Sequence, residues 1–261
     1  MFFTKKRTDG KDEQGACGKI ALVDLHSHVL PCLDDGSDSV ERSLEMLRCS
    51  YSQGVRKIVA TPHFYPNMTN PADFLERRSR AVESLSAAVS EHKALGESFP
   101  AVYLGAEVAY FDGISRSSSI SELCITGTRL LLVEMPFERW SETNIGELIA
   151  LKAKGFQPVV AHYDRYCSYQ EKGLLDRLLE GDVAIQLNAE ALLRFGTRRQ
   201  ALGMILEGAV GFFGSDCHNM TTRMPNLSDA VGIIGKSLGC DRVEQLMADA
   251  AAALECAETI V

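Results

Sequence analysis

The feature that most constrains the fold of this chain is a repeated alternation of short apolar segments with longer amphipathic ones. Helical patterns, with apolar residues three and four apart, separate several of the apolar segments, as in residues 40–51 and 72–95. Alternating strands and helices predict repeated βα units around a parallel sheet. The predicted strands are residues 20–23, 57–61, 102–105, 129–133, 157–161, 183–187 and 210–214.

The ends of these segments favour a closed barrel over an open sheet. Nearly every predicted strand is followed by His, Asp or Glu, and β/α barrels build their active sites from the C-terminal ends of their strands. Seven units are one fewer than a full barrel of this kind has. We therefore predict a distorted (β/α)7 barrel, similar to a TIM barrel, with residues 19–261 forming a single domain.

The first strand ends in the motif D-L-H-S-H, and a D-D-G turn follows it. Residues two apart in an extended segment face the same way, so His26 and His28 are expected to point at one spot. In isolation this motif would be more typical of two surface histidines beside a turn. The other strand ends argue against that interpretation, because five of the six histidines in the chain occur at them.

The residues at the strand ends form a candidate metal site. Imidazoles mixed with carboxylates fit Zn, Mn or Fe better than Ca or Mg. The candidates outnumber the ligands of one ion, since a tetrahedral zinc takes about four. We therefore expect two or three divalent ions with a bridging carboxylate, for which Glu107 is the candidate. The candidates are His26, His28, Asp35, His63, Glu107, Glu134, His162, Asp216 and His218.

Two arginines follow candidate ligands closely in the sequence. Arg165 comes three residues after His162, and Arg223 comes five residues after His218. A guanidinium on such a loop can bind phosphate oxygens bidentately, although an ordinary surface ion pair is the alternative interpretation.

The spacing from Cys217 to Arg223 is that of cysteine-dependent tyrosine phosphatases. That chemistry needs a thiolate of low pKa beneath a cradle of backbone N–H groups, which is usually rich in glycine. The intervening H-N-M-T-T contains no glycine, and Cys217 lies between two candidate ligands, which should point the other way. A thiol mechanism is therefore disfavoured.

Composition limits the compartments and partners. The net charge of −8 and the lack of a dense basic patch disfavour nucleic acid as a partner. Eight scattered cysteines without framework spacing indicate a reduced, cytoplasmic chain. No apolar run is long enough to span a membrane, and the N-terminus lacks the apolar core of a signal peptide. Residues 1–18 are predicted to form a polar, mobile extension.

Six motifs in this order resemble the polymerase-and-histidinol-phosphatase (PHP) superfamily: D-L-H-S-H…D-D-G, A-T-P-H, G-A-E, V-E-M-P-F, A-H-Y-D-R-Y and S-D-C-H-N…R. Within it they are similar to the bacterial manganese-dependent protein-tyrosine phosphatases of capsule and exopolysaccharide operons. The resemblance runs from Val23 to Asn226. It implies the distorted PHP barrel, a trinuclear site, and hydrolysis of phosphotyrosine on the tyrosine-rich tail of a bacterial tyrosine kinase. A metal-bridging hydroxide would be the nucleophile.

Carried over residue by residue, the resemblance assigns the nine candidates as ligands and both arginines as phosphate-binding residues. Manganese is favoured, with Fe and Zn as alternatives. Asp164 stands where family members commonly carry Glu, and either it or a metal-bound water would supply the proton for the leaving group. Asp24 is expected to orient a histidine. The polar extension at residues 1–18 is a second departure from the family pattern.

Some details of the site stay open at this point. His26 and His28 are expected to share one ion, while Asp35 reaches a different one. Phe137 and Trp140, in M-P-F-E-R-W, either line the mouth and stack on a tyrosyl ring or pack in the core or rim.

Several other functions compete with the tyrosine phosphatase. A histidinol-phosphate phosphatase would share the site, as would enzymes for other small phosphomonoesters. A metal-dependent amidohydrolase is disfavoured because Glu134 stands where such enzymes commonly have a bridging lysine. A polymerase-associated nuclease domain is disfavoured by the acidic balance. A catalytically silent, metal-binding module that docks to a kinase is the non-enzymatic alternative, and a homo-oligomer is left open.

Overall fold

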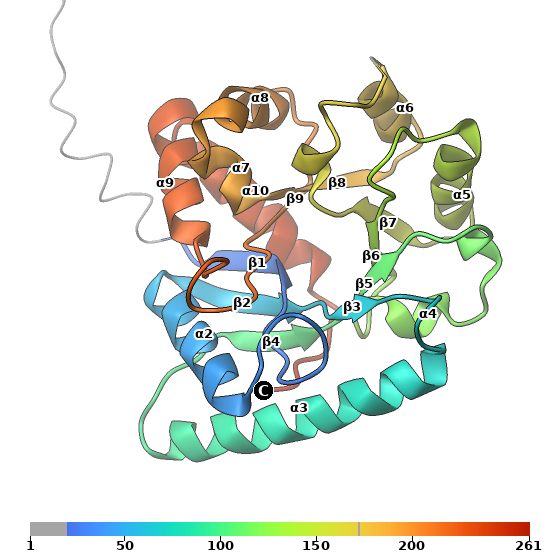
Figure 1. Cartoon of the computed structure of the whole chain (residues 1–261). Coiled ribbons are helices and arrows are strands. Elements are labelled where there is room, and N and C mark those ends of the chain that lie inside the picture. The colour runs from blue at the N-terminus through green and yellow to red at the C-terminus, as the bar shows by residue number, and fades with distance from the viewer. Residues whose placement is uncertain (1–19, 172) are drawn as a thin grey trace, which may run out of the picture.

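The computed structural model describes residues 20–171 and 173–261, and a curled parallel sheet forms its centre (Figure 1). Neighbouring strands follow the orders β1-β2-β4 and β3-β5-β6-β7-β8-β9, and every registered pair is parallel. The mobile extension predicted for residues 1–18 lies outside the described residues. The strands are β1 (Leu22–Ser27), β2 (Val55–Ala60), β3 (His63–Phe64), β4 (Ala101–Leu104), β5 (Glu107–Ala109), β6 (Leu130–Glu134), β7 (Gln157–Val160), β8 (Ala184–Asn188) and β9 (Phe212–Gly214).

The nine strands correspond to the seven predicted ones because two of those are interrupted. β2 continues into β3, and β4 continues into β5, with the breaks at Pro62 and Gly105. Proline has no N–H to donate to a neighbouring strand, which accounts for the first break. Pairing resumes in step after both breaks, with His63 opposite Glu107. The prediction of seven βα units is therefore confirmed.

The chain that follows β9 returns to β1 and closes the ring. The Asp216 N–H donates to the His26 carbonyl at 2.8 Å, and the His28 N–H donates to the Cys217 carbonyl at 2.9 Å. These bonds place the ends of the first and last strands side by side, as a barrel requires.

Helices cover the outer face of the sheet (Figure 1). The helices predicted at residues 40–51 and 72–95 are confirmed as α2 and α3. Ser39 is the N-cap of α2, and its side chain accepts from the Arg42 N–H at 3.2 Å. The helices are α2 (Val40–Ser52), α3 (Pro71–Ala94), α4 (Ile120–Leu123), α5 (Glu142–Ala153), α6 (Leu174–Glu180), α7 (Ala189–Leu193), α8 (Phe195–Leu206), α9 (Leu227–Leu238) and α10 (Cys240–Ala253), with 3₁₀ turns η1 (Ile114–Arg116) and η2 (Tyr163–Arg165).

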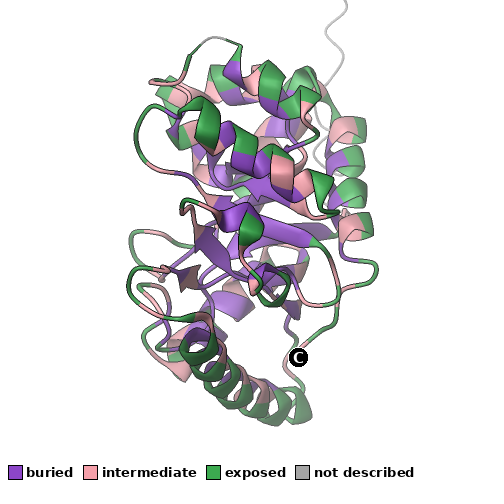
Figure 2. Cartoon of the chain, turned by 90° about the vertical axis from the view of Figure 1, so that its right-hand side faces the viewer, coloured by how far each residue is buried: buried purple, intermediate pink, exposed green. Residues whose placement is uncertain are grey.

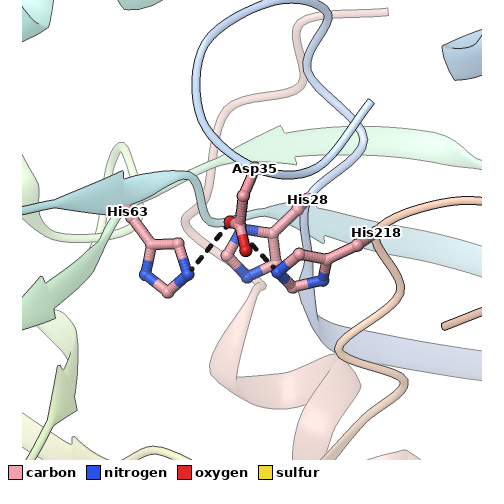
Figure 3. Close-up of side chains that lie close together, drawn as sticks. All are labelled: His28, Asp35, His63 and His218. Carbon is pink, nitrogen blue, oxygen red and sulfur yellow. Dashed lines mark ion pairs between the residues drawn. The ribbon is translucent and has the colours of Figure 1, made fainter. Parts of the chain in front are cut away.

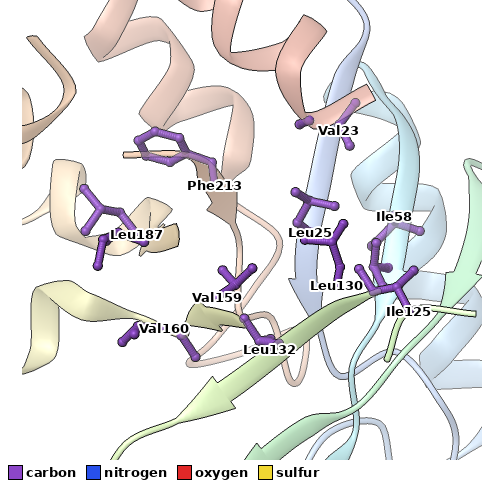
Figure 4. Close-up of a cluster of buried hydrophobic side chains, with 14 of the residues drawn as sticks. Val23, Leu25, Ile58, Ile125, Leu130, Leu132, Val159, Val160, Leu187 and Phe213 are labelled. Atoms are coloured by element: carbon purple, nitrogen blue, oxygen red, sulfur yellow. The ribbon is translucent and has the colours of Figure 1, made fainter. Parts of the chain in front are cut away.

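The core lies inside the barrel and between the sheet and its helices. Figure 2 shows the strands buried, with exposed residues gathered on the outer faces of the helices. Side chains from several strands meet in the interior, among them Leu25, Leu132 and Val159 (Figure 4). Burying one such side chain contributes about 1.5–3 kcal/mol. Strands buried on both faces explain why the sequence shows apolar runs rather than clean alternation. Among the described residues, no helix combines the length and hydrophobicity needed to cross a bilayer.

The closing strand approaches β1 so closely that only glycine fits at its end. A Cβ added to Gly214 would lie 2.4 Å from the His26 Cβ and 3.0 Å from the His26 backbone nitrogen. The contact with the backbone cannot be relieved by rotating a side chain. Gly214 therefore sets how near β9 comes to the first histidine motif.

We expect Gly214→Ala to lower the free energy of unfolding by about 2 kcal/mol or more, because β1 and β9 must separate to admit the methyl group. Urea unfolding followed by circular dichroism measures the change. The matched control is Gly146→Ala on α5, where nothing lies within 4 Å of the added Cβ. That variant should be more stable by up to about 1 kcal/mol. Equal stability of the two variants would contradict the packing described for β9.

Candidate metal centre

His26 and His28, at the end of β1, point at a common spot as their spacing predicts. Their Nε2 atoms are 3.2 Å apart, and both side chains are completely buried. The Nδ1 atom of His26 lies 3.1 Å from Gln186 Oε1, and that of His28 lies 2.7 Å from Asp34 Oδ2. Because each Nδ1 has its own partner, each Nε2 is left to face the centre of the site.

The Glu107 carboxylate lies between four of the histidines. Its Oε2 atom is 3.1 Å from His26 Nε2, 3.3 Å from His28 Nε2 and 3.1 Å from His63 Nδ1. Its Oε1 atom is 2.8 Å from His162 Nε2. These four imidazoles come from the C-terminal end of β1, the first residue of β3 and the segment after β7. Glu107 therefore occupies the position expected of a bridging ligand.

A second group lies at the outer side of the site and contains His28, Asp35, His63 and His218 (Figure 3). Asp35 Oδ1 is 3.4 Å from His63 Nε2 and 3.4 Å from His218 Nε2. Ligands bound to one ion at about 2.0–2.2 Å are themselves separated by about 3–3.6 Å. The spacing in this group is therefore suitable for a single cation.

The structure brings together all nine candidate ligands. Glu134 Oε1 is 3.5 Å from His162 Nε2, and Asp216 Oδ1 is 3.6 Å from His26 Nε2. Their convergence is a structural finding, whereas their role as ligands stays a prediction. Three overlapping groups of potential ligands result: His28, Asp35, His63 and His218; His26, His28 and Glu107; and His63, Glu107 and Glu134.

Several buried atoms of the cluster lack a hydrogen-bond partner among the described residues. They are His63 Nδ1, Glu107 Oε2, His162 Nδ1 and His218 Nε2. Buried polar atoms are nearly always paired, so such a concentration is unusual. Carboxylate and imidazole atoms that face one another without partners are suited to a divalent cation, and the residues therefore fit the predicted metals.

The carboxylates of the cluster hold protons on its histidines. Burial alone would lower the pKa of His28, but three neighbouring carboxylates favour its charged form and hold that pKa well above its usual range. Burial also opposes the charged form of His162, whose hydrogen bonds with Glu107 and Glu134 nevertheless raise its pKa to about 9. A metal ion must displace these protons, so binding is coupled to proton release.

Asp34 is a site residue that the sequence interpretation missed. Besides contacting His28, its Oδ2 atom accepts from the His63 N–H at 2.9 Å, and Oδ1 accepts from the Gly36 N–H at 3.0 Å. Burial would raise the pKa of Asp34, but the hydrogen bond and the charge of His28 hold it below its usual range. The only signal in the sequence was the neighbouring pair Asp34-Asp35, from which the interpretation selected the second residue.

β8 contributes amides where the other strands contribute charged or ionisable groups. Gln186 Oε1 accepts from the His162 N–H at 2.6 Å, in addition to its contact with the His26 ring. The Asn188 side chain donates to Asp216 Oδ2 at 2.7 Å. Both amides are buried. The sequence feature that could have revealed them is the presence of polar residues within the otherwise apolar run A-I-Q-L-N.

Arg165 and Arg223 reach the rim of the cluster through Asp216. Arg223 Nη2 lies 2.7 Å from Asp216 Oδ1, and Arg165 pairs with the other carboxylate oxygen. Their side chains are 34% and 35% exposed, so part of each guanidinium faces solvent. The loop that carries Arg223 is folded by the Asn219 side chain, which accepts from three backbone N–H groups, including that of Arg223 at 3.1 Å.

Two of the candidate ligands have a left-handed backbone. The φ angles are +33° at His162 and +53° at Asp216, a region that L-residues other than glycine seldom occupy. Such conformations cost about 1–3 kcal/mol each and persist only when their surroundings enforce them. Here the His162 N–H donates to Gln186 Oε1, and the Asp216 N–H donates to the His26 carbonyl.

The remaining acidic residues take positions that differ in part from expectation. Asp164 Oδ1 accepts from the Asn188 N–H at 2.9 Å, and burial raises the pKa of Asp164. Asp24, which was expected to orient a histidine, contacts the backbone of His26 and no histidine ring nitrogen. Its Oδ1 accepts from the Ser215 N–H at 2.9 Å and the His26 N–H at 3.2 Å, which ties β1 to the segment directly after β9.

The structure separates the two aromatic residues of M-P-F-E-R-W. Trp140 is buried, with its ring edge against Tyr166, whereas Phe137 is 61% exposed beside His162. Cys217 is completely buried, and burial raises the pKa of its thiol. A buried thiol with a raised pKa lacks the thiolate that cysteine-dependent phosphatases use.

Comparison with known proteins gives consistent matches along most of the chain. The family model for capsular polysaccharide synthesis, CpsB/CapC, matches residues 22–255. The chain is 30% identical over 230 residues to tyrosine-protein phosphatase YwqE of Bacillus subtilis, which covers 84% of this chain and 86% of that protein. It is 28% identical over 239 residues to tyrosine-protein phosphatase CpsB of Streptococcus agalactiae, which covers 86% of this chain and 94% of that protein.

A solved structure confirms the fold. It comes from crystal structures of YwqE from Bacillus subtilis and CpsB from Streptococcus pneumoniae, described as metal-dependent tyrosine phosphatases. The TM-score is 0.76 at 24% identity, and the match covers 91% of this chain and 96% of that chain. The predicted distorted barrel is therefore confirmed.

We expect His26→Ala and Asp35→Ala each to lose about one bound ion, because the two residues belong to different groups and a site that loses one of about four ligands binds weakly. The double variant should then lose both ions. Elemental analysis of manganese-loaded, gel-filtered protein measures the stoichiometry. If the double variant loses no more metal than either single variant, the two residues serve the same ion. His28 belongs to both groups and is unsuited to this test.

We expect Asp34→Asn to weaken metal binding by about 10–100-fold, because it removes the carboxylate that fixes the His28 ring. Titration with a competing chelator measures the affinity. Asp38→Asn is the matched control, since Asp38 lies in the same loop and is exposed. Equal affinities in the two variants would show that Asp34 does not position His28.

Proposed function

The chain belongs to the CpsB/CapC family of capsular polysaccharide synthesis, and we propose that it is a metal-dependent protein-tyrosine phosphatase. The substrate we infer is phosphotyrosine on the tyrosine-rich tail of a bacterial kinase that regulates capsular or exopolysaccharide synthesis, in the cytoplasm. Relatives named tyrosine-protein phosphatases support the activity. The observation that carries the proposal is the meeting of nine potential metal ligands and two arginines at one rim.

Divalent ions are the cofactors that this rim would hold. We propose manganese, with Fe and Zn as alternatives, because imidazole and carboxylate ligands suit these metals. Three overlapping ligand groups support as many as three ions. When bound, such ions would act as Lewis acids on the phosphoryl group and lower the pKa of water at the site. The residues that would hold them are His26, His28, Asp35, His63, Glu107, Glu134, His162, Asp216 and His218.

Arg165 and Arg223 are the residues that we assign to the phosphoryl group. Each guanidinium is partly exposed and already neutralises one oxygen of Asp216. A planar guanidinium can donate two parallel hydrogen bonds to phosphate oxygens, and these strengthen as charge develops in the transition state. In a chain with a net charge of −8, two cations at one rim also attract a dianionic ester locally.

Asp164 is the residue that we assign to the proton of the leaving group. Burial raises its pKa, which favours the protonated form that can donate. Its hydrogen bond from the Asn188 N–H fixes one oxygen and leaves the other to carry the proton. A tyrosine hydroxyl has a pKa of about 10, so phenolate is a tolerable leaving group and a weak acid is sufficient.

We expect phosphotyrosyl peptide to be hydrolysed in preference to histidinol phosphate when manganese is added, and chelator to abolish the activity because the metal cluster supplies the Lewis acid. Arg223→Ala should lower kcat/KM by about 10²–10³-fold, since it removes a donor to the developing charge. Phosphate release from both substrates under identical conditions measures the preference.

Cys217→Ser is the control for this experiment. It should keep its activity because the buried thiol has no chemical role here. Activity that survives chelation but is lost in Cys217→Ser would replace the metal mechanism with a thiol mechanism. Preference for histidinol phosphate would make the chain a small-molecule phosphatase, and no turnover of either substrate would favour the kinase-docking module.

A further inference from the structure

Phe137 is a large apolar side chain that stays 61% exposed beside the candidate metal centre. Its ring stacks on the imidazole of His162, with centroids 6.0 Å apart and planes inclined by 18°. On its other side, His162 lies 2.8 Å from Glu107. A single imidazole therefore separates the Phe137 ring from the carboxylate at the centre of the cluster.

The loop that carries Phe137 is fixed by hydrogen bonds from buried rings. The Tyr166 hydroxyl donates to the Met135 carbonyl at 2.9 Å, and Trp140 Nε1 donates to the Pro136 carbonyl at 2.9 Å. Both rings are buried. The Phe137 side chain is thus exposed on a loop whose backbone is held by hydrogen bonds.

Gln170 fixes the other side of the same loop. Its side-chain NH₂ donates to the Glu138 carbonyl at 2.9 Å, and its Oε1 accepts from the Trp140 N–H at 3.1 Å. Backbone on both sides of Phe137 is therefore held in place before any ligand arrives.

The rings behind Phe137 form a continuous aromatic support. The centroids of the Tyr166 and Phe137 rings are 5.2 Å apart. The Trp140 ring meets the Tyr166 ring edge-on, with centroids 5.0 Å apart. One part of the Phe137 ring is packed on this support and on His162. The remaining surface is apolar, rigid and open to solvent, which is a surface that an incoming ring can cover with a gain in free energy.

We propose that Phe137 is an aryl platform that selects phosphate esters of aromatic alcohols. This inference rests on the proposed phosphatase function, because it requires the phosphoryl group to lie at Arg165 and Arg223. In a phosphotyrosyl residue the ring adjoins the phosphoester oxygen directly, so it leaves the metal rim beside His162 and meets Phe137. A phosphoserine residue or a small aliphatic ester has no ring to place there. Phe137 thus acts on specificity through contact with the leaving group.

The test compares the binding of phenylphosphonate and methylphosphonate to the manganese-loaded protein by calorimetry. Neither compound is hydrolysed, so the comparison isolates the ring from the chemistry. The wild-type chain should bind phenylphosphonate about fivefold more tightly than methylphosphonate. Phe137→Ala should lose this preference and keep its affinity for methylphosphonate, whereas Phe137→Tyr should retain the preference.

Leu206→Ala is the matched control, because Leu206 is 69% exposed and lies at the far end of α8, just before the chain enters β9. It should bind both phosphonates as the wild-type chain does. Equal affinities in the wild-type chain, or a preference that survives Phe137→Ala, would overturn the platform and leave the phosphatase function intact. An equal loss of both affinities in Phe137→Ala would also overturn it, because Phe137 would then merely shield His162. Absence of phosphonate binding together with absence of hydrolysis would overturn the phosphatase function and the platform with it.

Discussion

The structure depends on a buried carboxylate, Glu107, that is surrounded by imidazoles. Removing an ionised carboxylate from water costs several kcal/mol unless charges or hydrogen-bond donors replace the water. Counted with neutral histidines, the cluster has five carboxylates and two guanidinium groups, which leaves three negative charges uncompensated. Protons on histidines such as His28 and His162 reduce this excess in the metal-free chain. Divalent cations would neutralise this excess directly. Metal binding would therefore also relieve the electrostatic repulsion between the carboxylates inside the barrel.

The interruptions of two strands determine which side chains meet at this carboxylate. β3 begins at His63 and β5 begins at Glu107, directly after the breaks at Pro62 and Gly105, and these two residues are paired in register. The Glu107 N–H donates to the Pro62 carbonyl at 3.0 Å, so the break is itself fixed by hydrogen bonding. A straight strand would continue the apolar runs of β2 and β4. The breaks instead interrupt these runs just before the candidate ligands His63 and Glu107.

The sequence was sufficient to predict the seven βα units and the convergence of the nine candidates, because both depend on local patterns. Strand ends are marked by the change from apolar to ionisable residues, and a parallel barrel brings all those ends to one rim. Which side chain each acidic residue contacts depends on segments that are distant in the sequence. These contacts were therefore not predictable from local patterns. Asp34 and Asp35 have identical chemistry, and only the fold shows that Asp34 holds His28 while Asp35 faces His63. The contact between Asp24 and Ser215 was not predictable for the same reason, because Ser215 follows the last strand and lies far away in the sequence.

Gln186 shows how such distant contacts make the site rigid. Its one amide oxygen meets the His26 ring from β1 and the His162 N–H after β7, while its NH₂ group donates to Asn188 at 2.9 Å. The left-handed backbone of His162 is strained, and this hydrogen bond is part of what maintains it. A neutral amide can fix two ligands without adding charge to a cluster that already carries an excess. Because the same bonds join β1, β7 and β8, any ion that binds these ligands also stabilises the barrel, and the gain grows with its concentration relative to its dissociation constant.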